Sequence, residues 1–141
     1  AKVAADANAV ERQVRAFAPA PGAFNVCYLN GFQTQPNERG FWRGKRGRLL
    51  LRARGKPVVD AAWGELLLDV RTPRKRQALA QIVGGWIDGC AAKGYDAVEF
   101  DNLDSFTRSR GLLKRRQAIK YAALLVQRAH AVGLLAGQKN L

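Results

Sequence analysis

The most constraining feature of this sequence is an alternation of short apolar strands and long amphipathic helices over its second half. The predicted strands and helices occupy, in order, residues 63–70, 72–94, 96–100, 113–132 and 134–137. Helical crossovers of this length join parallel strands in right-handed βαβ units. The pattern therefore predicts an α/β fold that is built on a parallel sheet.

The first of these helices has clear start and stop signals. Thr72 is a good N-cap residue, Pro73 suits the first helical turn, and Gly94 suits the C-terminal end. Apolar side chains then recur at helical spacing, at Leu79, Ile82, Val83, Trp86, Ile87 and Cys90. Such a stripe predicts a helix that packs one face on the sheet.

The N-terminal part of the chain is less informative. Residues 1–16 are rich in alanine with mixed charges and predict a loose helix, which the Pro- and Gly-containing stretch 17–22 breaks. We treat residues 1–23 as a lead-in and expect the main domain to span residues 24–141. Its first strand is predicted at residues 24–29, which are β-branched and aromatic.

Positive charge is strong and unevenly distributed, with a net charge of +13. Residues 37–56 hold eight basic residues and several glycines, and predict a long surface excursion with a brief strand at residues 49–51. We expect this excursion to pin its aromatics, Phe41 and Trp42, to the core. The charge is typical of a polyanion-binding protein, but also of a merely solubilising surface. Because no zinc-finger, RNP-like or helix-turn-helix pattern is present, nucleic acid is not expected as a partner.

The cysteine and histidine content limits which disulfides, metal sites and cofactor sites the protein can have. Cys27 and Cys90 lie in apolar contexts, so buried free thiols are the default, with one disulfide as the alternative in a secreted protein. A single histidine, His130, falls near a predicted helix end, so we expect neither a zinc site nor another cofactor. No apolar run is long enough to span a membrane, and no signal peptide is visible in this chain.

A cluster of carboxylates stands where the strand at residues 96–100 ends. Glu99, Asp101 and Asp104 lie within six residues, with the amide of Asn102 among them. Side chains alternate along a strand, so Glu99 and Asp101 point to the same face. Adjacent carboxylates raise each other's pKa, which suits acid/base chemistry, whereas an Asx-rich turn would explain the same residues without function.

Polar residues also follow the other predicted strands. Asp69, Asp101, Asn102, Lys139 and Asn140 lie at or just beyond the carboxyl ends of their strands. This edge carries the catalytic residues in βα barrels and the ligand in open parallel sheets. Since no glycine-rich phosphate loop follows a strand, nucleotide binding is not favoured.

Several motifs, in order along the chain, resemble one known family. They occupy residues 25–36, 63–69, 98–104, 108–113, 129–134 and 137–140. Together they are similar to glycoside hydrolase family 114, which contains endo-α-1,4-polygalactosaminidases, although Phe100 stands where proline is more usual. The resemblance implies a partial (β/α) TIM barrel with about four to five parallel strands and outer helices. It also implies an extracellular protein.

The resemblance further implies the residues of the site. Asp101 is carried over as a catalytic carboxylate, either as the nucleophile or as the acid/base. The implied substrate-binding residues are Tyr28, Asn30, Asp69, Glu99, Asn102, Asp104, Lys139 and Asn140. Lys139 would pair with Asp101 or Glu99, or bind a sugar hydroxyl. Trp63 would be either a sugar platform or a buried barrel tryptophan.

The implied substrate is an α-1,4-linked galactosamine polymer. The family's second catalytic carboxylate is a glutamate on a later strand, and its motif is not found here. The first strand of the family's barrel, which would precede residues 24–29, is not recognisable either. A TIM barrel typically needs about 250 residues. We therefore expect a barrel fragment with little or no activity alone, whose open sheet edges favour self-association. The alternative is a non-catalytic basic α/β domain that binds nucleic acid or another polyanion.

Overall fold

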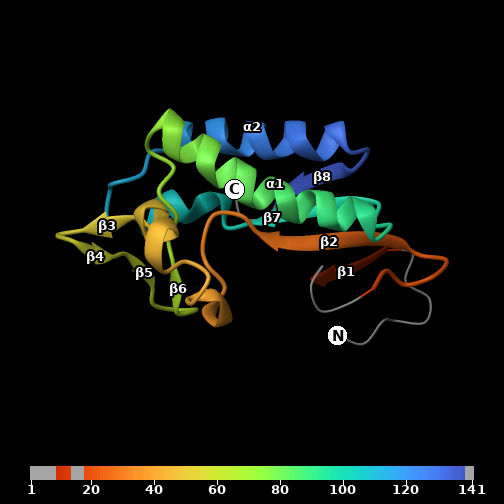
Figure 1. Ribbon diagram of the computed structural model, residues 1–141, viewed down its shortest axis with the longest axis horizontal. Coiled ribbons are helices and arrows are strands. Elements are labelled where there is room, and N and C mark those ends of the chain that lie inside the picture. Colours follow the sequence, from red (N-terminus) through yellow and green to blue (C-terminus); the bar gives the residue numbers. More distant parts are fainter. Residues whose placement is uncertain (1–8, 14–17, 139–141) are drawn as a thin grey trace.

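A parallel sheet of four strands forms the centre of the fold (Figure 1). The computed structural model describes residues 9–13 and 18–138. The strands are β1 (Ala9–Gln13), β2 (Phe24–Asn30), β7 (Ala97–Asp101) and β8 (Leu135–Gln138), and they lie in the order β1-β2-β7-β8. The register pairs Asn30 with Asp101, so the carboxyl ends of the two central strands meet.

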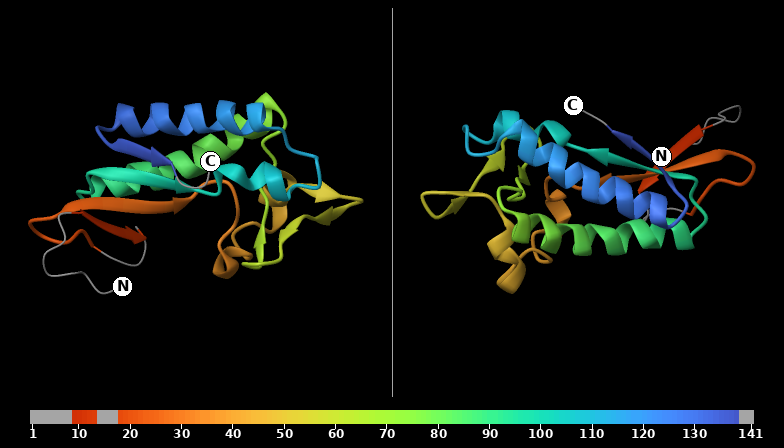
Figure 2. Two further views of the ribbon diagram at one scale, coloured as in Figure 1. Left: turned by 180° about the vertical axis from the view of Figure 1, so that it is seen from behind. Right: turned by 90° about the horizontal axis from the view of Figure 1, so that it is seen from above.

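Two long helices cover the same face of this sheet and lie side by side (Figure 2). They are α1 (Pro73–Ala92) and α2 (Arg115–Ala131). The predicted cap of α1 is confirmed, because the Lys75 amide donates to the Thr72 hydroxyl over 3.2 Å. The apolar stripe of α1 and the inward side of α2 close the core, with Leu79, Val83, Ile87, Tyr121 and Leu125 fully buried.

The excursion is longer than the predicted residues 37–56. It comprises residues 31–72, connects β2 to α1 and lies beyond the carboxyl end of β2 (Figure 1). Its elements are η1 (Pro36–Glu38), η2 (Gly44–Leu49), β3 (Arg52–Ala53), β4 (Lys56–Pro57), β5 (Val59–Asp60) and β6 (Glu65–Leu66). The four strands form two small antiparallel pairs, β3 with β4 and β5 with β6. The expected pinning of the aromatics is confirmed, because Trp42 is buried and its ring packs on Phe41 and Trp86.

The predicted parallel strand at residues 63–70 is wrong. Only β6 forms there, it pairs antiparallel with β5, and it is not part of the main sheet. Leu67 and Leu68 are fully buried. Backbone hydrogen bonds tie this run to other residues of the excursion, from Leu51 N–H to the Leu67 carbonyl and from Asp69 N–H to the Leu49 carbonyl. A continuous apolar run signals burial, but it does not say which neighbour buries it.

The brief strand predicted at residues 49–51 is also wrong. Leu49 ends η2, and Leu50 forms only an isolated antiparallel bridge to Leu68. All three leucines are nevertheless buried, as their apolar character required. Burial was therefore predictable here, whereas the backbone conformation was not.

The N-terminal stretch differs from the expected loose helix. Residues 9–13 form β1, which runs parallel to β2 with Ala9 opposite Phe24. The rest of residues 1–16, apart from this strand, lies outside the described residues. The expectation that a first strand is missing is therefore wrong; pairing with the β2 backbone, and not local composition, decides the conformation.

A disulfide joins the sheet to the helix layer. Cys27 of β2 and Cys90 of α1 are bonded across a sequence separation of 63 residues, and both side chains are fully buried. The default expectation of free thiols is therefore wrong, and the alternative of one disulfide is correct. Within the described residues, no helix has the length and apolar character to cross a membrane.

Candidate active site

Asp101 lies at the carboxyl end of β7, where two neighbours orient its carboxylate. The Tyr28 hydroxyl of β2 donates to Asp101 Oδ2 over 2.5 Å, and the backbone N–H of Asn102 donates to Asp101 Oδ1 over 2.8 Å. Tyr28 and Asp101 are both half-buried, so the carboxylate keeps an open side. Parallel pairing of β2 and β7 explains why residues so far apart in sequence meet.

Asn102 turns the chain sharply after β7. Its φ of 65° is left-handed, a conformation that asparagine tolerates better than most residues. The turn leads into η3 (Leu103–Arg108) and directs the Asn102 side chain inward. The Asn102 Nδ2 donates to Asn30 Oδ1 over 2.9 Å and to Glu65 Oε1 over 3.2 Å.

Glu65 belongs to the excursion and also accepts a hydrogen bond from Gln33. The Gln33 Nε2 donates to Glu65 Oε1 over 2.8 Å and to Asp60 Oδ2 over 3.2 Å. All three side chains are buried, so these hydrogen bonds satisfy groups that water does not reach. Neither Gln33, Asp60 nor Glu65 was predicted from the sequence as a site residue.

Arg108 of η3 closes the network from the other side. Its Nη2 donates to Asp104 over 3.0 Å and to Gln33 over 3.0 Å, and its Nε lies 3.1 Å from Asp60 Oδ2. Burial alone would lower the pKa of the Arg108 guanidinium. The hydrogen bond and charge of Asp104, with the charges of Asp60 and Asp101, outweigh burial, and the pKa is raised. Arg108 is therefore held as a permanent cation among carboxylates.

A cleft of about 480 Å³ opens above these residues. It is lined by Tyr28, Gln35, Pro36, Trp63, Glu65, Asp101 and Asn102. Trp63 is 72% exposed, so the expectation of a buried barrel tryptophan is wrong and its ring is free to meet a ligand. Two carboxylates, two amides, a phenol and an indole suit the hydroxyls and apolar faces of sugars.

Asp69 does not belong to this cleft. Its carboxylate is buried at the entry to α1, where Arg71 Nε and Lys75 Nζ lie 2.9 and 2.7 Å from its oxygens. Burial raises the pKa of Asp69, but the hydrogen bonds from Arg71 and Lys75 outweigh it and leave the pKa lowered. Asp69 was expected at the sheet edge because residues 63–70 were expected to be a strand of the main sheet.

The remaining predicted residues are placed as follows. Glu99 is half-buried on β7 and faces Tyr28 and Gly137 in the register. Asp104 lies in η3 and pairs with Arg108. Lys139 and Asn140 lie outside the described residues. In the part of the chain that the structure describes, no group of three or more histidines, cysteines and carboxylates is placed to hold a metal ion.

The geometry defines a class of protein. Parallel strands with outer helices, and a carboxylate cleft beyond the carboxyl ends of the strands, are the arrangement of (β/α)-barrel enzymes. The chain belongs to glycoside-hydrolase family GH114, whose model matches residues 2–141. The resemblance drawn from the ordered motifs is thereby confirmed. None of the curated proteins that were compared matches the chain.

Solved structures confirm the fold as a partial barrel. The chain superposes on Ega3 of Aspergillus fumigatus, determined in complex with galactosamine, with a TM-score of 0.69 and 24% identity over 99% of this chain and 55% of Ega3. It superposes on a variant of the glycoside hydrolase domain of PelA from Pseudomonas aeruginosa with a TM-score of 0.67 and 20% identity, over 94% of this chain and 52% of that domain. An α-galactosidase from Thermus thermophilus in complex with stachyose gives a TM-score of 0.55 and 20% identity, over 83% of this chain and 28% of that enzyme. The chain thus spans about half the length of the first two structures.

Proposed function

We propose that this domain forms part of a glycoside hydrolase active site that cleaves α-1,4-linked galactosamine polymers, with Asp101 as a catalytic carboxylate. The observation that carries the proposal is the orientation of Asp101 by Tyr28 and Asn102 in a cleft that also presents Trp63. Family membership supports the reaction class, and the galactosamine bound to the similar protein Ega3 supports the sugar.

The charges of the cleft favour a cationic sugar. Asp60, Glu65, Asp101 and Asp104 supply four carboxylates around the cleft and its supporting network. Arg108 forms ion pairs with two of them, Asp60 and Asp104. Exposed charges farther than about 8 to 10 Å are largely screened at physiological ionic strength. A cluster of this kind therefore attracts the ammonium groups of galactosamine even though the chain carries a net charge of +13.

Asp101 and Glu65 would have different roles. Both oxygens of Asp101 accept hydrogen bonds, which suits an ionised carboxylate that attacks or stabilises the sugar carbon. Glu65 accepts two amide N–H groups at one oxygen, which suits an anion that binds substrate better than an acid that donates a proton. Glycoside hydrolysis needs a second carboxyl group as acid. We therefore propose that this chain alone binds the polymer and has little or no activity.

The test is a titration of the chain with a defined α-1,4-linked galactosamine oligomer, followed by calorimetry and by product analysis. We expect binding without appreciable hydrolysis, and a rise in Kd of roughly tenfold or more in Asp101→Asn. Asp96→Asn, which removes a carboxylate near the opposite end of β7, is the matched control. Absence of binding by the native chain would refute the site. Hydrolysis that Asp101→Asn abolishes would refute only the expected inactivity.

We also propose that the protein is extracellular and self-associates through its sheet edge. The Cys27–Cys90 disulfide supports an oxidising compartment. Leu135 on β8 is 61% exposed, and β8 is an edge strand of the described sheet. Sedimentation should show a concentration-dependent oligomer that Leu135→Lys weakens. A native chain that stays monomeric at high concentration would contradict the association.

A further inference from the structure

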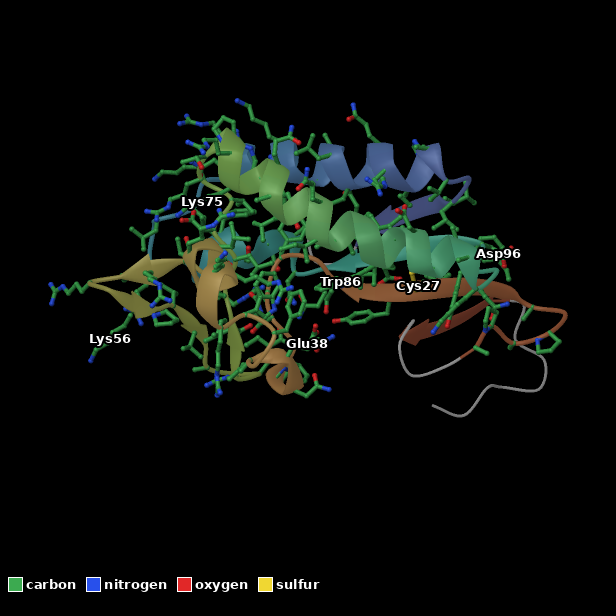
Figure 3. All side chains as sticks on the ribbon, in the orientation of Figure 1. Cys27, Glu38, Lys56, Lys75, Trp86 and Asp96 are labelled. Atoms are coloured by element: carbon green, nitrogen blue, oxygen red, sulfur yellow. A yellow bond between two sulfur atoms is a disulfide. The ribbon has the colours of Figure 1, made fainter. Side chains whose placement is uncertain are left out.

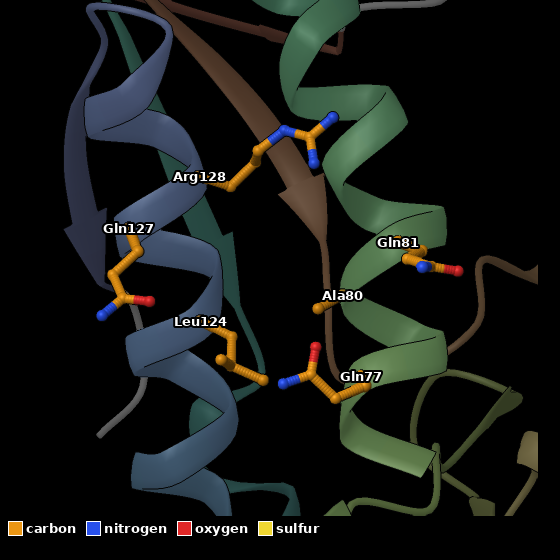
Figure 4. A pocket seen from close by; sticks show the side chains of 6 residues that line it. All are labelled: Gln77, Ala80, Gln81, Leu124, Gln127 and Arg128. Atoms are coloured by element: carbon orange, nitrogen blue, oxygen red, sulfur yellow. The ribbon is translucent and has the colours of Figure 1, made fainter. Parts of the chain in front are cut away.

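Two adjoining polar hollows beside α1 form what we call the groove. Their volumes are about 680 and 300 Å³. The first is lined by Arg48, Thr72, Arg74, Lys75, Gln77, Ala78 and Gln81, and the second by Gln77, Ala80, Gln81, Leu124, Gln127 and Arg128. The hollows share Gln77 and Gln81, and the second lies between α1 and α2 (Figure 4).

The groove offers cations, amides and a hydroxyl, and neither a carboxylate nor an aromatic ring is among its lining residues. Lys75 pairs with Asp69, which also pairs with Arg71, and Arg128 pairs with Asp88. Arg48 and Arg74 are exposed and, within the described residues, neither forms an ion pair. The guanidinium groups of Arg48 and Arg74 are therefore available to a ligand in the hollow that Gln77 and Gln81 also line.

The surroundings of the groove are also cationic. Exposed bases without an ion pair, among the residues that the structure describes, include Lys45, Arg46, Arg52, Arg54, Lys56, Lys114, Arg115 and Arg116. The first turns of α1 and α2 contain no acidic residue, although the helix dipole favours acids there. Figure 3 shows Lys56 and Lys75 toward the same end of the molecule. An anionic ligand would relieve the mutual repulsion of these charges.

We propose that this groove binds an acidic polysaccharide. Guanidinium groups match carboxylates with paired hydrogen bonds, which suits Arg48 and Arg74. The side chains of Thr72, Gln77 and Gln81 suit the hydroxyl groups of the same sugar chain. Two adjoining hollows that share Gln77 and Gln81 have room for more than one sugar unit, which suits a polymer better than a small anion. The lack of aromatic rings on the lining argues against single-stranded nucleic acid, which is bound by stacking.

This site is separate from the acidic cleft and goes beyond the proposed hydrolysis. The residues that line the groove and those that line the cleft do not overlap. The two sites have opposite charge and would take opposite polymers. A chain held on a polyanion would therefore keep its cleft open to a cationic substrate.

The experiment measures binding of the whole chain to a fluorescent oligogalacturonate at several salt concentrations. We expect binding that weakens as salt rises. In Arg48→Gln/Arg74→Gln the Kd should rise at least roughly tenfold and the salt dependence should flatten. Lys93→Gln/Lys120→Gln removes the same two charges outside the groove and should leave the Kd within about twofold of the native value.

Three further measurements identify the ligand class. Gln77→Ala/Gln81→Ala should weaken binding by a smaller factor with an unchanged salt slope, because amide–hydroxyl contacts carry no net charge. The same oligomer with its carboxylates reduced to alcohols should not bind. Equal binding of the reduced oligomer, unchanged binding by the double arginine variant, or tighter binding of duplex DNA of equal charge would each overturn the proposal. The substituted side chains are exposed, and circular dichroism verifies that each variant is folded.

Discussion

The acidic cleft and the cationic groove are built in different ways. The cleft and the hydrogen-bonded network below it gather residues from β2, β6, β7 and η3. The network joins side chains as far apart as Gln33 and Arg108, separated by 75 residues. The groove takes most of its lining from α1 and the turn before it, with Arg48 added from the excursion and three side chains from α2. The hydrogen-bonded residues of the network below the cleft are buried or half-buried, whereas Arg48 and Arg74 are exposed.

This difference predicts how each region responds to mutation. Removing one partner from the buried network leaves other polar groups unsatisfied, so variants of the network should lose both stability and binding. Removing an exposed guanidinium leaves only water behind, so groove variants should lose binding alone. The substitutions below test this separation.

The largest effect is expected where the two regions are joined. Cys27 is next to Tyr28 of the cleft, and Cys90 is on the helix that carries the groove. Cys27→Ala/Cys90→Ala should lower the free energy of unfolding by about 4 kcal/mol, because the bond closes a long loop in the unfolded chain. Urea denaturation measures the loss.

Reductant is the matched control for this variant. It should destabilise the native chain in urea and leave the variant unchanged. If the disulfide also positions the cleft, galactosamine-oligomer binding will weaken more than oligogalacturonate binding. Equal losses at both sites would show that the bond contributes only stability.

The parts that could be predicted from sequence are those with local signals. Helix α1 was predicted because Thr72, Pro73 and Gly94 mark its ends within the chain itself. The position of Asp101 and Asn102 at the sheet edge followed from the rule that carboxyl ends of parallel strands converge. Neither inference needed knowledge of distant contacts.

The rest of the site depends on long-range contacts that a single sequence does not reveal. Glu65 reaches Asn102 only because the excursion brings it back to the carboxyl ends of β2 and β7, across a separation of 37 residues. Arg108 was visible as part of a family motif, but nothing local indicated that it binds Asp60 and Gln33. Apolar residues 66–68 were predicted as a parallel strand because a short apolar run indicates burial without showing which part of the fold buries it.

Arg108→Met should have the second largest effect. The substitution leaves Asp60, a buried carboxylate, without its cation, and should lower the free energy of unfolding by roughly 3 kcal/mol. Arg116→Met removes an exposed cation and should change stability by less than about 0.5 kcal/mol. Thermal and urea unfolding measure both. A small loss in Arg108→Met would show that water, and not Arg108, satisfies Asp60.

Asp69→Asn should have an intermediate effect that depends on pH. The folded-state pKa of Asp69 lies below its ordinary value of 3.8, so the unfolded state binds the proton more readily. The stabilisation is therefore full above pH 3.8 and is lost as the pH falls through the folded-state pKa. Near neutral pH the variant should be less stable by about 2 kcal/mol. Urea midpoints that do not converge below pH 3.8 would contradict the ion pairs with Arg71 and Lys75.

Trp63→Ala should have the smallest effect on stability and should separate binding at the cleft from binding at the groove. Trp63 is 72% exposed, so its removal should change the free energy of unfolding by less than about 0.5 kcal/mol. If its ring is a sugar platform, the Kd for a galactosamine oligomer should rise by about tenfold. Oligogalacturonate binding should be unchanged, because Trp63 does not line the groove. Phe24→Ala, another exposed aromatic, is the matched control, and equal effects of the two substitutions would remove Trp63 from the site.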